Sequence, residues 1–380
     1  MSLAASPAPR RATRKVRVLV VDDSAVVRGM THRWLSGEDD IDLAGVAENG
    51  EVGVKEAGRL KPDVIILDVE MPKMTGLEAL PLIRKAAPGA SVIMASTLTH
   101  RGAKVTIQAL AGGAADYLPK PESRGLGGAE GYKRTLIEKV RGLGQAAIAK
   151  EARTKQTPAA ARQPETPAQV KPARPIALAT PSRRIGLRPD ILVVGCSTGG
   201  PAALQVFLKP LAQSLSTPIL IVQHMPKTFT AILAEHLSKH LGLDCKEAVD
   251  GEPVRPGAVR IAPGDYHMRL VRAPSGATLK LSQDPPVNFC RPAVDPLFDS
   301  AAALYGDRTL GVVLTGMGHD GREGARSLTK AGARVLVQDE ASSVVWGMPG
   351  AVAEAGLASA VEPLDRLGHT TVSYLNGSGR

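Results

Sequence analysis

Short apolar runs alternate with helical patterns in the first third of the chain. The first run is VRVLVV at 16–21 and the last is ADYLPK at 115–120, with IDLAGVA at 41–47, DVIILD at 63–68 and ASVIMAS at 90–96 between them. Strand patterns that alternate with helical patterns are typical of a parallel sheet with crossover helices. The pattern predicts a doubly wound α/β domain over residues 16–140.

A second series of apolar runs extends over residues 189–372. Its members are ILVVG at 191–195, PILIVQH at 218–224, AVRIAP at 258–263, MRLVRAPSGATLKL at 268–281, LGVVLTG at 310–316 and ARVLVQ at 333–338. The run at 268–281 has the pattern of a hairpin, and the others are typical of parallel strands. We therefore predict a second, larger doubly wound α/β domain.

The stretch 141–188 separates the two series and is expected to be a flexible linker. From about Gln145 it is rich in Ala, Pro, Thr, Gln and Lys, and it contains TPAAARQPETPAQVKPARP. This segment shows neither helical nor strand periodicity, and its composition is typical of disordered chain. Residues 1–15 are likewise expected to be a disordered basic tail. A linker of this kind allows the flanking domains to touch or to separate.

The formal net charge of +10 lies mostly outside the predicted domains. Residues 1–17 carry five Arg or Lys and no acid, and residues 150–188 carry nine against two Glu, so the remainder is slightly acidic. A nucleic-acid-binding domain keeps its positive charge on a folded face with recognisable reading elements, and neither a helix-turn-helix pattern nor interleaved aromatics are present. We expect solvated basic tails and no nucleic-acid partner.

The cysteine content and the apolar runs narrow the class of protein further. Three cysteines without metal-ligand spacing support neither a disulfide framework nor a zinc site. No apolar run approaches the roughly 18 residues that span a bilayer, and no signal-type core follows the basic N-terminus. The expectation is a cytoplasmic protein that is not embedded in a membrane.

Polar residues end four of the five apolar runs in the first domain. Asp22 and Asp23 follow the first run, Asp68 ends the third, Ser96 the fourth and Lys120 the fifth. The carboxyl ends of parallel strands meet at one edge of the sheet. Three neighbouring carboxylates need a hard cation such as Mg²⁺, and a lysine with a hydroxyl would hold a phosphoryl group placed on one carboxylate.

Each of these residues alone has a plainer explanation, such as a helix cap or a solvated turn. The joint pattern of VVDDS, ILDVEMPKMTG, MAST and LPKP resembles the response-regulator receiver domain, which is flavodoxin-like. The resemblance implies that Asp68 accepts phosphate from a histidine kinase and that Mg²⁺ is held by Asp22, Asp23 and Asp68, with the backbone of Glu70 as a further ligand. It also implies that Ser96 and Lys120 read the phosphate and that Tyr117 changes position with it.

A Gly-rich turn follows the first strand of the second domain. Gly195-Cys196-Ser197-Thr198-Gly199 satisfies the G-x-S-x-G pattern directly after a strand and before a helical segment. The turn by itself is equally compatible with a nucleophile at Ser197 and with a phosphate-binding loop. Cys196 is a rival nucleophile, but its side chain is expected to point back from the turn.

A nucleophilic serine needs a base, and His224 at the end of PILIVQH is the best placed. His267 and His319 are other possible bases, whereas His236 and His240 have the four-residue spacing of a solvated helical face. Asp320 in LTGMGHDG is the best candidate to orient the imidazole, with Asp295 as its chief rival.

The chain order Ser197, His224, Asp320 departs from the Ser, Asp, His order of α/β-hydrolases and disfavours that fold. At this point GCSTGG, QHMP, APGDYHM, RPAVDPLF, LTGMGHDG and WGMPGA resemble the CheB-type protein-glutamate methylesterases of chemotaxis, whose catalytic domain is Rossmann-like. The resemblance implies that Ser197 is the nucleophile, His224 its base and Asp320 the partner of His224. Backbone amides near Met317, and at Thr198, would form the oxyanion hole.

The same resemblance implies the reaction and the partners. Family members hydrolyse glutamyl methyl esters on the cytoplasmic helices of chemoreceptors to glutamate and methanol, and many also deamidate receptor glutamines. No cofactor is expected for this step. Our main hypothesis is an esterase whose receiver domain inhibits it until Asp68 is phosphorylated, and the alternative is a regulator whose output domain only binds a partner or a nucleotide.

Overall fold

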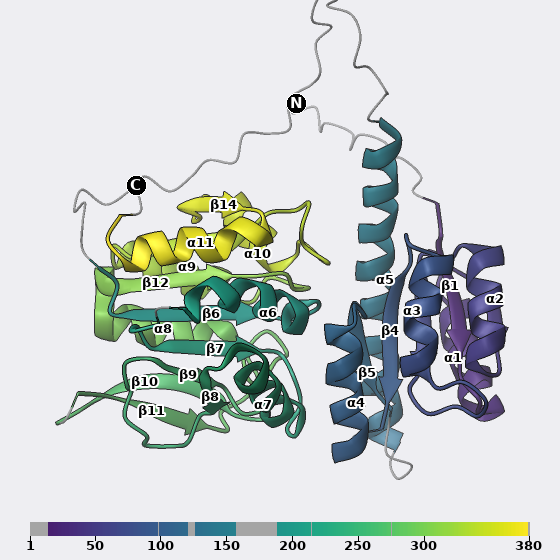
Figure 1. Cartoon of the computed structure of the whole chain (residues 1–380), viewed down its shortest axis with the longest axis horizontal. Helices are drawn as coiled ribbons and strands as arrows, with labels where there is room; N and C mark the ends of the chain where they lie inside the picture. The colour runs from purple at the N-terminus through teal and green to yellow at the C-terminus, as the bar shows by residue number, and fades with distance from the viewer. Residues whose placement is uncertain are drawn as a thin grey trace, which may run out of the picture.

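The chain forms two α/β domains (Figure 1), and the computed structural model describes residues 14–97, 99–120, 126–156, 188–213, 215–274 and 276–378. The strand segments expected in each domain are found with ends that shift by one to three residues at most. No helix among the described residues is both long and apolar enough to cross a bilayer.

The first domain has a five-stranded parallel sheet in the order β2-β1-β3-β4-β5. This order is that of the flavodoxin-like fold. Its strands are β1 (Val16–Val21), β2 (Ile41–Ala47), β3 (Val64–Asp68), β4 (Ser91–Ser96) and β5 (Asp116–Pro119). Its helices are α1 (Ala25–Ser36), α2 (Gly50–Leu60), α3 (Gly76–Ala86), α4 (His100–Ala111) and α5 (Leu126–Gln156).

Two buried clusters cover the faces of this sheet. Helices α2, α3 and α4 pack on one face and α1 and α5 on the other. The start of α3 is fixed by a capping box in which Thr75 accepts from the amide of Glu78 and Glu78 accepts from the amide of Thr75. A Cβ on Gly76 would lie 2.0 Å from the carbonyl oxygen of Asp68, so only glycine lets α3 begin against the end of β3.

Helix α5 corrects the expected linker boundary. It is 31 residues long and continues to Gln156, so residues 141–156 are helical rather than flexible. Three of its apolar side chains, Leu136, Val140 and Leu143, are buried, and this packing outweighs the weak helical pattern of the sequence. The remaining linker residues, 157–187, and residues 1–13 of the expected tail lie outside the described residues. Arg14, at the end of that tail, donates to Asp63 and Glu151.

The second domain has a seven-stranded parallel sheet in the order β14-β13-β12-β6-β7-β9-β8. This is the Rossmann-like order with one strand, β8, added at an edge. The strands are β6 (Ile191–Cys196), β7 (Ile219–Gln223), β8 (Asp244–Glu247), β9 (Ala258–Ile261), β12 (Thr309–Val313), β13 (Arg334–Gln338) and β14 (Ala360–Glu362). The edge strands β8 and β14 are short and partly polar, and the sequence pattern did not predict them.

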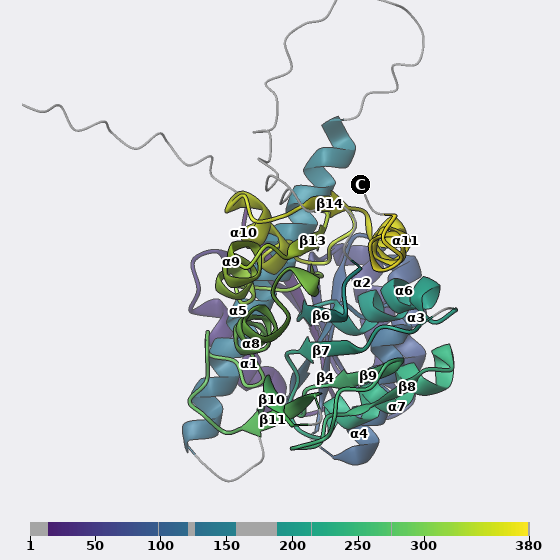
Figure 2. The same ribbon diagram turned by 90° about the vertical axis from the view of Figure 1, so that its left-hand side faces the viewer.

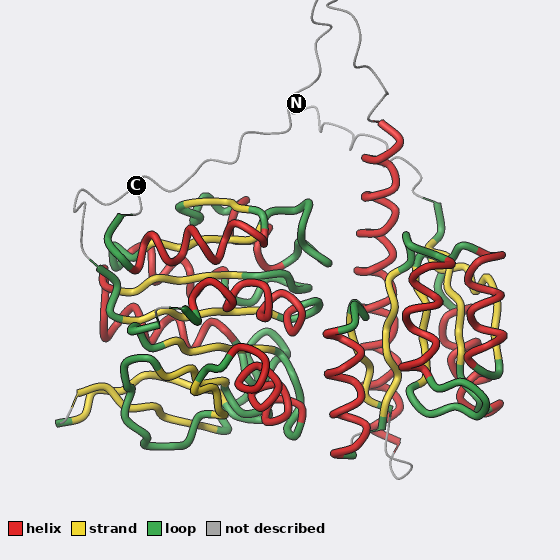
Figure 3. Tube along the Cα trace, viewed as in Figure 1, coloured by secondary structure: helices red, strands yellow, loops and turns green. Residues whose placement is uncertain are grey.

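Helices cover both faces of this sheet as well (Figure 2). One face carries α6 (Gly200–Leu211), α7 (Phe229–Leu241) and α11 (Leu364–Leu375), and the other carries α8 (Val294–Tyr305), α9 (Arg322–Lys330) and α10 (Met348–Glu354). The predicted hairpin is β10 (His267–Ala273) and β11 (Gly276–Ser282), which lies outside the main sheet (Figure 3).

The two domains meet along β5, α4 and α5 of the first and α6, α7 and the β12–α9 loop of the second (Figure 1). The ring of Tyr117 stacks on that of Phe229 at a centroid distance of 4.8 Å. Val345 is buried in one cluster with Leu136 and Val140 of α5, and Met317 packs against that cluster. The domain interface therefore continues the hydrophobic cores of both domains.

Candidate active site and receiver site

The candidate catalytic residues lie at the carboxyl edge of the second sheet. Ser197 follows β6, His224 follows β7, and Asp320 lies in the loop after β12. Strand β6 pairs with β7 on one side and β12 on the other, so the strand order reverses at β6. Ligands of doubly wound sheets bind at such a switch point.

Backbone hydrogen bonds fix the turn that carries Ser197. Its amide donates to the carbonyl of Thr315 at 3.1 Å, and its carbonyl accepts from Gly200 at 2.8 Å and from the side chain of Gln223 at 2.9 Å. Gly199 has φ +78°, which favours glycine, and a Cβ on Gly200 would lie 2.0 Å from Oε1 of Gln223. These glycines are therefore required by the geometry of the turn.

The imidazole of His224 contacts the carboxylate of Asp320. The distance from Nε2 to Oδ2 is 2.7 Å, and both side chains are about nine-tenths or more buried. Burial alone lowers the pKa of His224, but the thiol of Cys290 and the carboxylate of Asp320 more than offset this and raise the pKa to about 10.

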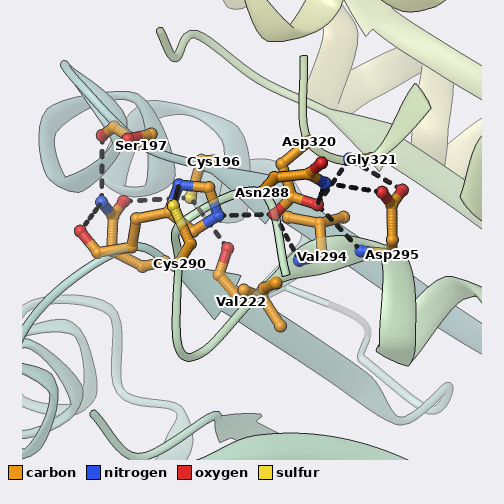
Figure 4. Close-up of polar contacts among 12 residues, drawn as sticks. Cys196, Ser197, Val222, Asn288, Cys290, Val294, Asp295, Asp320 and Gly321 are labelled. Carbon is orange, nitrogen blue, oxygen red and sulfur yellow. Dashed lines mark hydrogen bonds and ion pairs between the residues drawn. The ribbon is translucent and has the colours of Figure 1, made fainter. Parts of the chain in front are cut away.

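Asp320 is held by donors from its surroundings (Figure 4). Its carboxylate accepts from the amides of Val294 at 2.6 Å, Asp295 at 3.2 Å and Gly321 at 3.0 Å, and from the side chain of Asn288 at 2.9 Å. Burial by itself raises the pKa of Asp320, but His224 and these donors lower it to about 2. Asp320 is therefore ionised and oriented toward His224.

The rival residues have other partners. Asp295 accepts from the amides of Gly321 and Gly324 and from Asn288, and burial together with the charge of Asp320 raises its pKa. The fully buried His267 is bonded to the amide of Ala293 and the carbonyl of Pro285. His319 is exposed. Asp320 rather than Asp295 thus contacts His224.

Cys196 points away from the turn, as expected. Its thiol is fully buried and donates to Oε1 of Gln223 at 3.0 Å, and burial raises its pKa. His236 and His240 lie on α7 with their rings 4.0 Å apart, away from the strand ends that carry Ser197 and His224.

Ser197 and His224 are not hydrogen-bonded to each other in the part of the chain that the structure describes. Because Nε2 of His224 is taken by Asp320, the nitrogen left for a nucleophile is Nδ1. Nδ1 instead lies 3.5 Å from Sγ of Cys290. The free nitrogen of the candidate base His224 therefore faces a thiol.

Of the two predicted oxyanion residues, Thr198 belongs to the Ser197 turn and Met317 lies in the loop between β12 and α9. Gly316, the residue before Met317, lies next to Ser197 in space, because a Cβ on Gly316 would lie 3.0 Å from Cβ of Ser197. Over the described ranges, the backbone amides of Met317 and Thr198 have no acceptor. The hydroxyl of Thr198 donates to Asp116 of the first domain at 2.5 Å.

The first domain brings its predicted residues together as well. Nζ of Lys120 lies 2.8 Å from both Asp22 and Asp68, and the carboxylates of Asp22, Asp23 and Asp68 offer oxygens within 4.8 Å of one another. Burial raises the pKa of Asp68 to about 6, although Lys120 acts in the opposite direction. The buried Ser96 lines a small pocket with Asp68 and Lys120.

Four residues with clear contacts at the candidate active site were not predicted from the sequence. Gln223 braces the serine turn, Asn288 bridges Asp295 and Asp320, Cys290 faces His224, and Asp116 contacts Thr198. The QHMP motif already contains Gln223, and its alternation places that side chain on the face opposite to Val222. The other three reach the site from segments whose place only the tertiary fold determines.

Comparison with known proteins gives matches along most of the chain. A family model described as CheB methylesterase matches residues 192–371, and one described as response regulator receiver domain matches residues 18–126. A protein of Maricaulis maris is 50% identical over 384 residues, covering 95% of this chain and 96% of the relative. One of Caulobacter vibrioides is 51% identical over 354 residues, covering 93% and 97%. Both relatives are named protein-glutamate methylesterase/protein-glutamine glutaminase.

Among solved structures, the CheB methylesterase catalytic domain of Thermotoga maritima is 41% identical, covering 49% of this chain and 99% of that one with a TM-score of 0.48. The fold and the motifs define a receiver domain joined to a hydrolytic α/β domain. With relatives of about 50% identity over nearly its full length, the chain belongs to the CheB family of protein-glutamate methylesterases/protein-glutamine glutaminases.

The contact between His224 and Asp320 predicts a change in titration. Asp320→Asn removes a charge that raises the pKa of His224, so we expect this pKa to fall from about 10 by at least one pH unit, equivalent to about 1.4 kcal/mol. The His224 ring is followed by NMR as pH is raised, with Asp299→Asn, an exposed carboxylate, as the matched control. An unchanged His224 titration in Asp320→Asn would contradict the assigned contact.

Proposed function

We propose that the chain hydrolyses glutamyl methyl esters on the cytoplasmic helices of chemoreceptors and deamidates specific receptor glutamines, with Ser197, His224 and Asp320 as its catalytic residues. The observation that carries this proposal is the buried pair of His224 and Asp320 beside the Gly-rich turn of Ser197. The names of the relatives support the same two activities.

In the proposed reaction, Oγ of Ser197 attacks the ester or amide carbonyl while Nδ1 of His224 takes its proton. The tetrahedral intermediate collapses to an acyl-enzyme when His224 returns the proton to the leaving methanol or ammonia. Water then attacks the acyl group by the same steps and releases glutamate. Asp320 keeps the imidazole oriented and stabilises its protonated form throughout.

The unsatisfied amides at Met317 and Thr198 support their assignment to the oxyanion hole. Donors fixed in place before the reaction stabilise the developing negative charge, and the loss of one costs about 3–4 kcal/mol in other hydrolases. Since both amides belong to turns that the first domain contacts, the position of that domain bears directly on this hole.

Phosphorylation is assigned to Asp68, with a phosphohistidine of a histidine kinase as the donor. The oxygen donors of Asp22, Asp23 and Asp68 fit Mg²⁺, a hard cation that neutralises charge on the incoming phosphoryl group. Lys120 and Ser96 are expected to contact the phosphoryl oxygens once Asp68 carries them, and their positions beside Asp68 support this role. We expect this phosphoryl transfer to take place in the cytoplasm.

Inhibition of the esterase by the unphosphorylated receiver domain is supported by the domain interface. The receiver residue Asp116 accepts from Thr198, next to the nucleophile. A Cβ on Gly142 of α5 would lie 2.6 Å from Sδ of Met317, so α5 sits directly against the second oxyanion residue. A substrate helix needs the space that these elements occupy. The alternative of an output domain without turnover is not favoured, because the named relatives are enzymes.

The catalytic assignment predicts the effect of removing one hydroxyl. Ser197→Ala is expected to lower kcat/KM for methanol release from a methylated receptor fragment by about 10⁴-fold or more, since only binding and oxyanion contacts remain. Ser373→Ala, whose hydroxyl bonds only a helix carbonyl, is the matched control. Activity of Ser197→Ala near that of the control would refute the assignment.

The regulatory assignment predicts a loss of activation. With a small-molecule phosphoryl donor and Mg²⁺, the unaltered protein should release methanol several-fold faster, because the acyl phosphate at Asp68 carries about two negative charges in place of the one on the carboxylate and shifts the receiver face. Asp68→Asn should keep the basal rate and show no gain, whereas Asp39→Asn, an exposed acid remote from the site, should respond normally. A gain in Asp68→Asn equal to that of the unaltered protein would contradict the proposal.

A further inference from the structure

A thiol, an imidazole and a carboxylate lie in series beside the serine turn. Sγ of Cys290 is 3.5 Å from Nδ1 of His224, and Nε2 of the same ring is 2.7 Å from Asp320. This is the order of nucleophile, base and orienting acid that activates a cysteine. Cys290 thus occupies the position relative to the base that the mechanism assigns to Ser197.

A tight turn holds Cys290 in this position. The amides and carbonyls of Val287 and Cys290 are bonded to each other in both directions, at 2.9 and 3.1 Å. The two residues between them, Asn288 and Phe289, have φ of +51° and +62°. Residues other than glycine adopt this left-handed conformation only at an energetic cost. Asn288 offsets this strain by donating to both Asp295 and Asp320. The turn is therefore anchored to the same carboxylate that orients His224.

Cys290 is also the one cysteine of the three that solvent reaches. Cys196 and Cys245 are buried, whereas Cys290 is partly exposed. Its neighbour Phe289 is 91% exposed, so the turn lies at the surface of the catalytic domain. A reactive cysteine needs both access and a nearby base, and only Cys290 combines them.

We propose that Cys290 is a covalent modification site for small soft electrophiles, with His224 as the base that takes its proton, and that modification blocks the esterase. This inference rests on the proposed role of His224. An adduct on Sγ occupies the space next to Nδ1, which Ser197 needs because Nε2 is bound to Asp320. The shared chemistry is attack by a thiolate, and both alkylating agents and peroxides are suitable electrophiles.

Both reactions balance with the groups present. With iodoacetamide, the thiol proton passes to Nδ1, a bond forms from sulfur to the methylene carbon, and iodide leaves. With hydrogen peroxide, sulfur attacks one oxygen and the O–O bond breaks, so that sulfur is oxidised by two electrons to sulfenic acid and peroxide is reduced. The departing hydroxide then takes the proton from His224 and leaves as water.

The test uses the full-length protein, with iodoacetamide in one arm and hydrogen peroxide in the other, and follows each cysteine by peptide mass spectrometry. Cys290 should be modified at least about tenfold faster than Cys196 or Cys245. His224→Gln should slow alkylation of Cys290 by about tenfold or more, since the base is lost. Loss of esterase activity should follow Cys290 modification in time, and Cys290→Ser should keep its own starting activity under the same treatment.

Equal alkylation of Cys290 in His224→Gln and in the unaltered protein would overturn the proposal. So would equal inactivation of Cys290→Ser and the unaltered protein. Ser197→Ala separates this inference from the proposed function, because its Cys290 should be alkylated at the unaltered rate although its esterase activity is absent. Modification by iodoacetamide but not by peroxide would support the site and assign it to alkylating electrophiles.

Discussion

The coupling of the two domains depends on the hydrogen bond that the carboxylate of Asp116 accepts from Thr198. Asp116 is buried at the start of β5, an edge strand of the receiver sheet. Its carboxylate accepts from Lys139 of its own domain and from the hydroxyl of Thr198, one residue beyond the proposed nucleophile. Unpaired burial of a carboxylate is costly, so this group must keep its partners for as long as the interface stays dry. Lys139 also lies 5.3 Å from the ring centroid of Tyr117, which stacks on Phe229. The ion pair of Asp116 with Lys139 and the stacked rings therefore lie next to each other beside the serine turn.

Of the three proposed catalytic residues, His224 and Asp320 are in contact in this docked arrangement, whereas Ser197 is not hydrogen-bonded to His224. His224 is bound to Asp320, its pKa is raised to about 10, and its second nitrogen faces Cys290 rather than Ser197. Because Nδ1 of His224 faces Cys290, the proposed catalysis by Ser197 requires a rearrangement at His224 as well as the departure of the receiver domain. The first domain contacts Thr198 and Met317, so the departure of the receiver domain and the rearrangement at His224 both involve the turns that carry these two residues.

Most of the fold was predictable because strand periodicity and strand-end residues are local signals. The runs that became β3, β6 and β7 are buried along their length and β1 is buried except at Arg17, and residues at their carboxyl ends converge for topological reasons. The helical residues 141–156 were not predictable, since burial of Leu143 against the receiver sheet, rather than propensity, determines that part of α5. Nor were the contacts of Asn288 and Cys290, because a turn between Val287 and Cys290 is positioned by long-range bonds to Asp295 and Asp320.

The central claim is that the receiver domain closes the catalytic site until Asp68 is phosphorylated, and amide hydrogen exchange of the full-length protein with and without a phosphoryl donor and Mg²⁺ tests it most directly. Phosphorylation, verified at Asp68 by mass spectrometry, should speed exchange in residues 229–237 of α7 and in the loop 315–318. Strands β6 and β12, at the centre of the catalytic sheet, provide internal controls whose exchange should not change. Unchanged exchange at α7 and at the loop in protein phosphorylated on Asp68 would contradict the account.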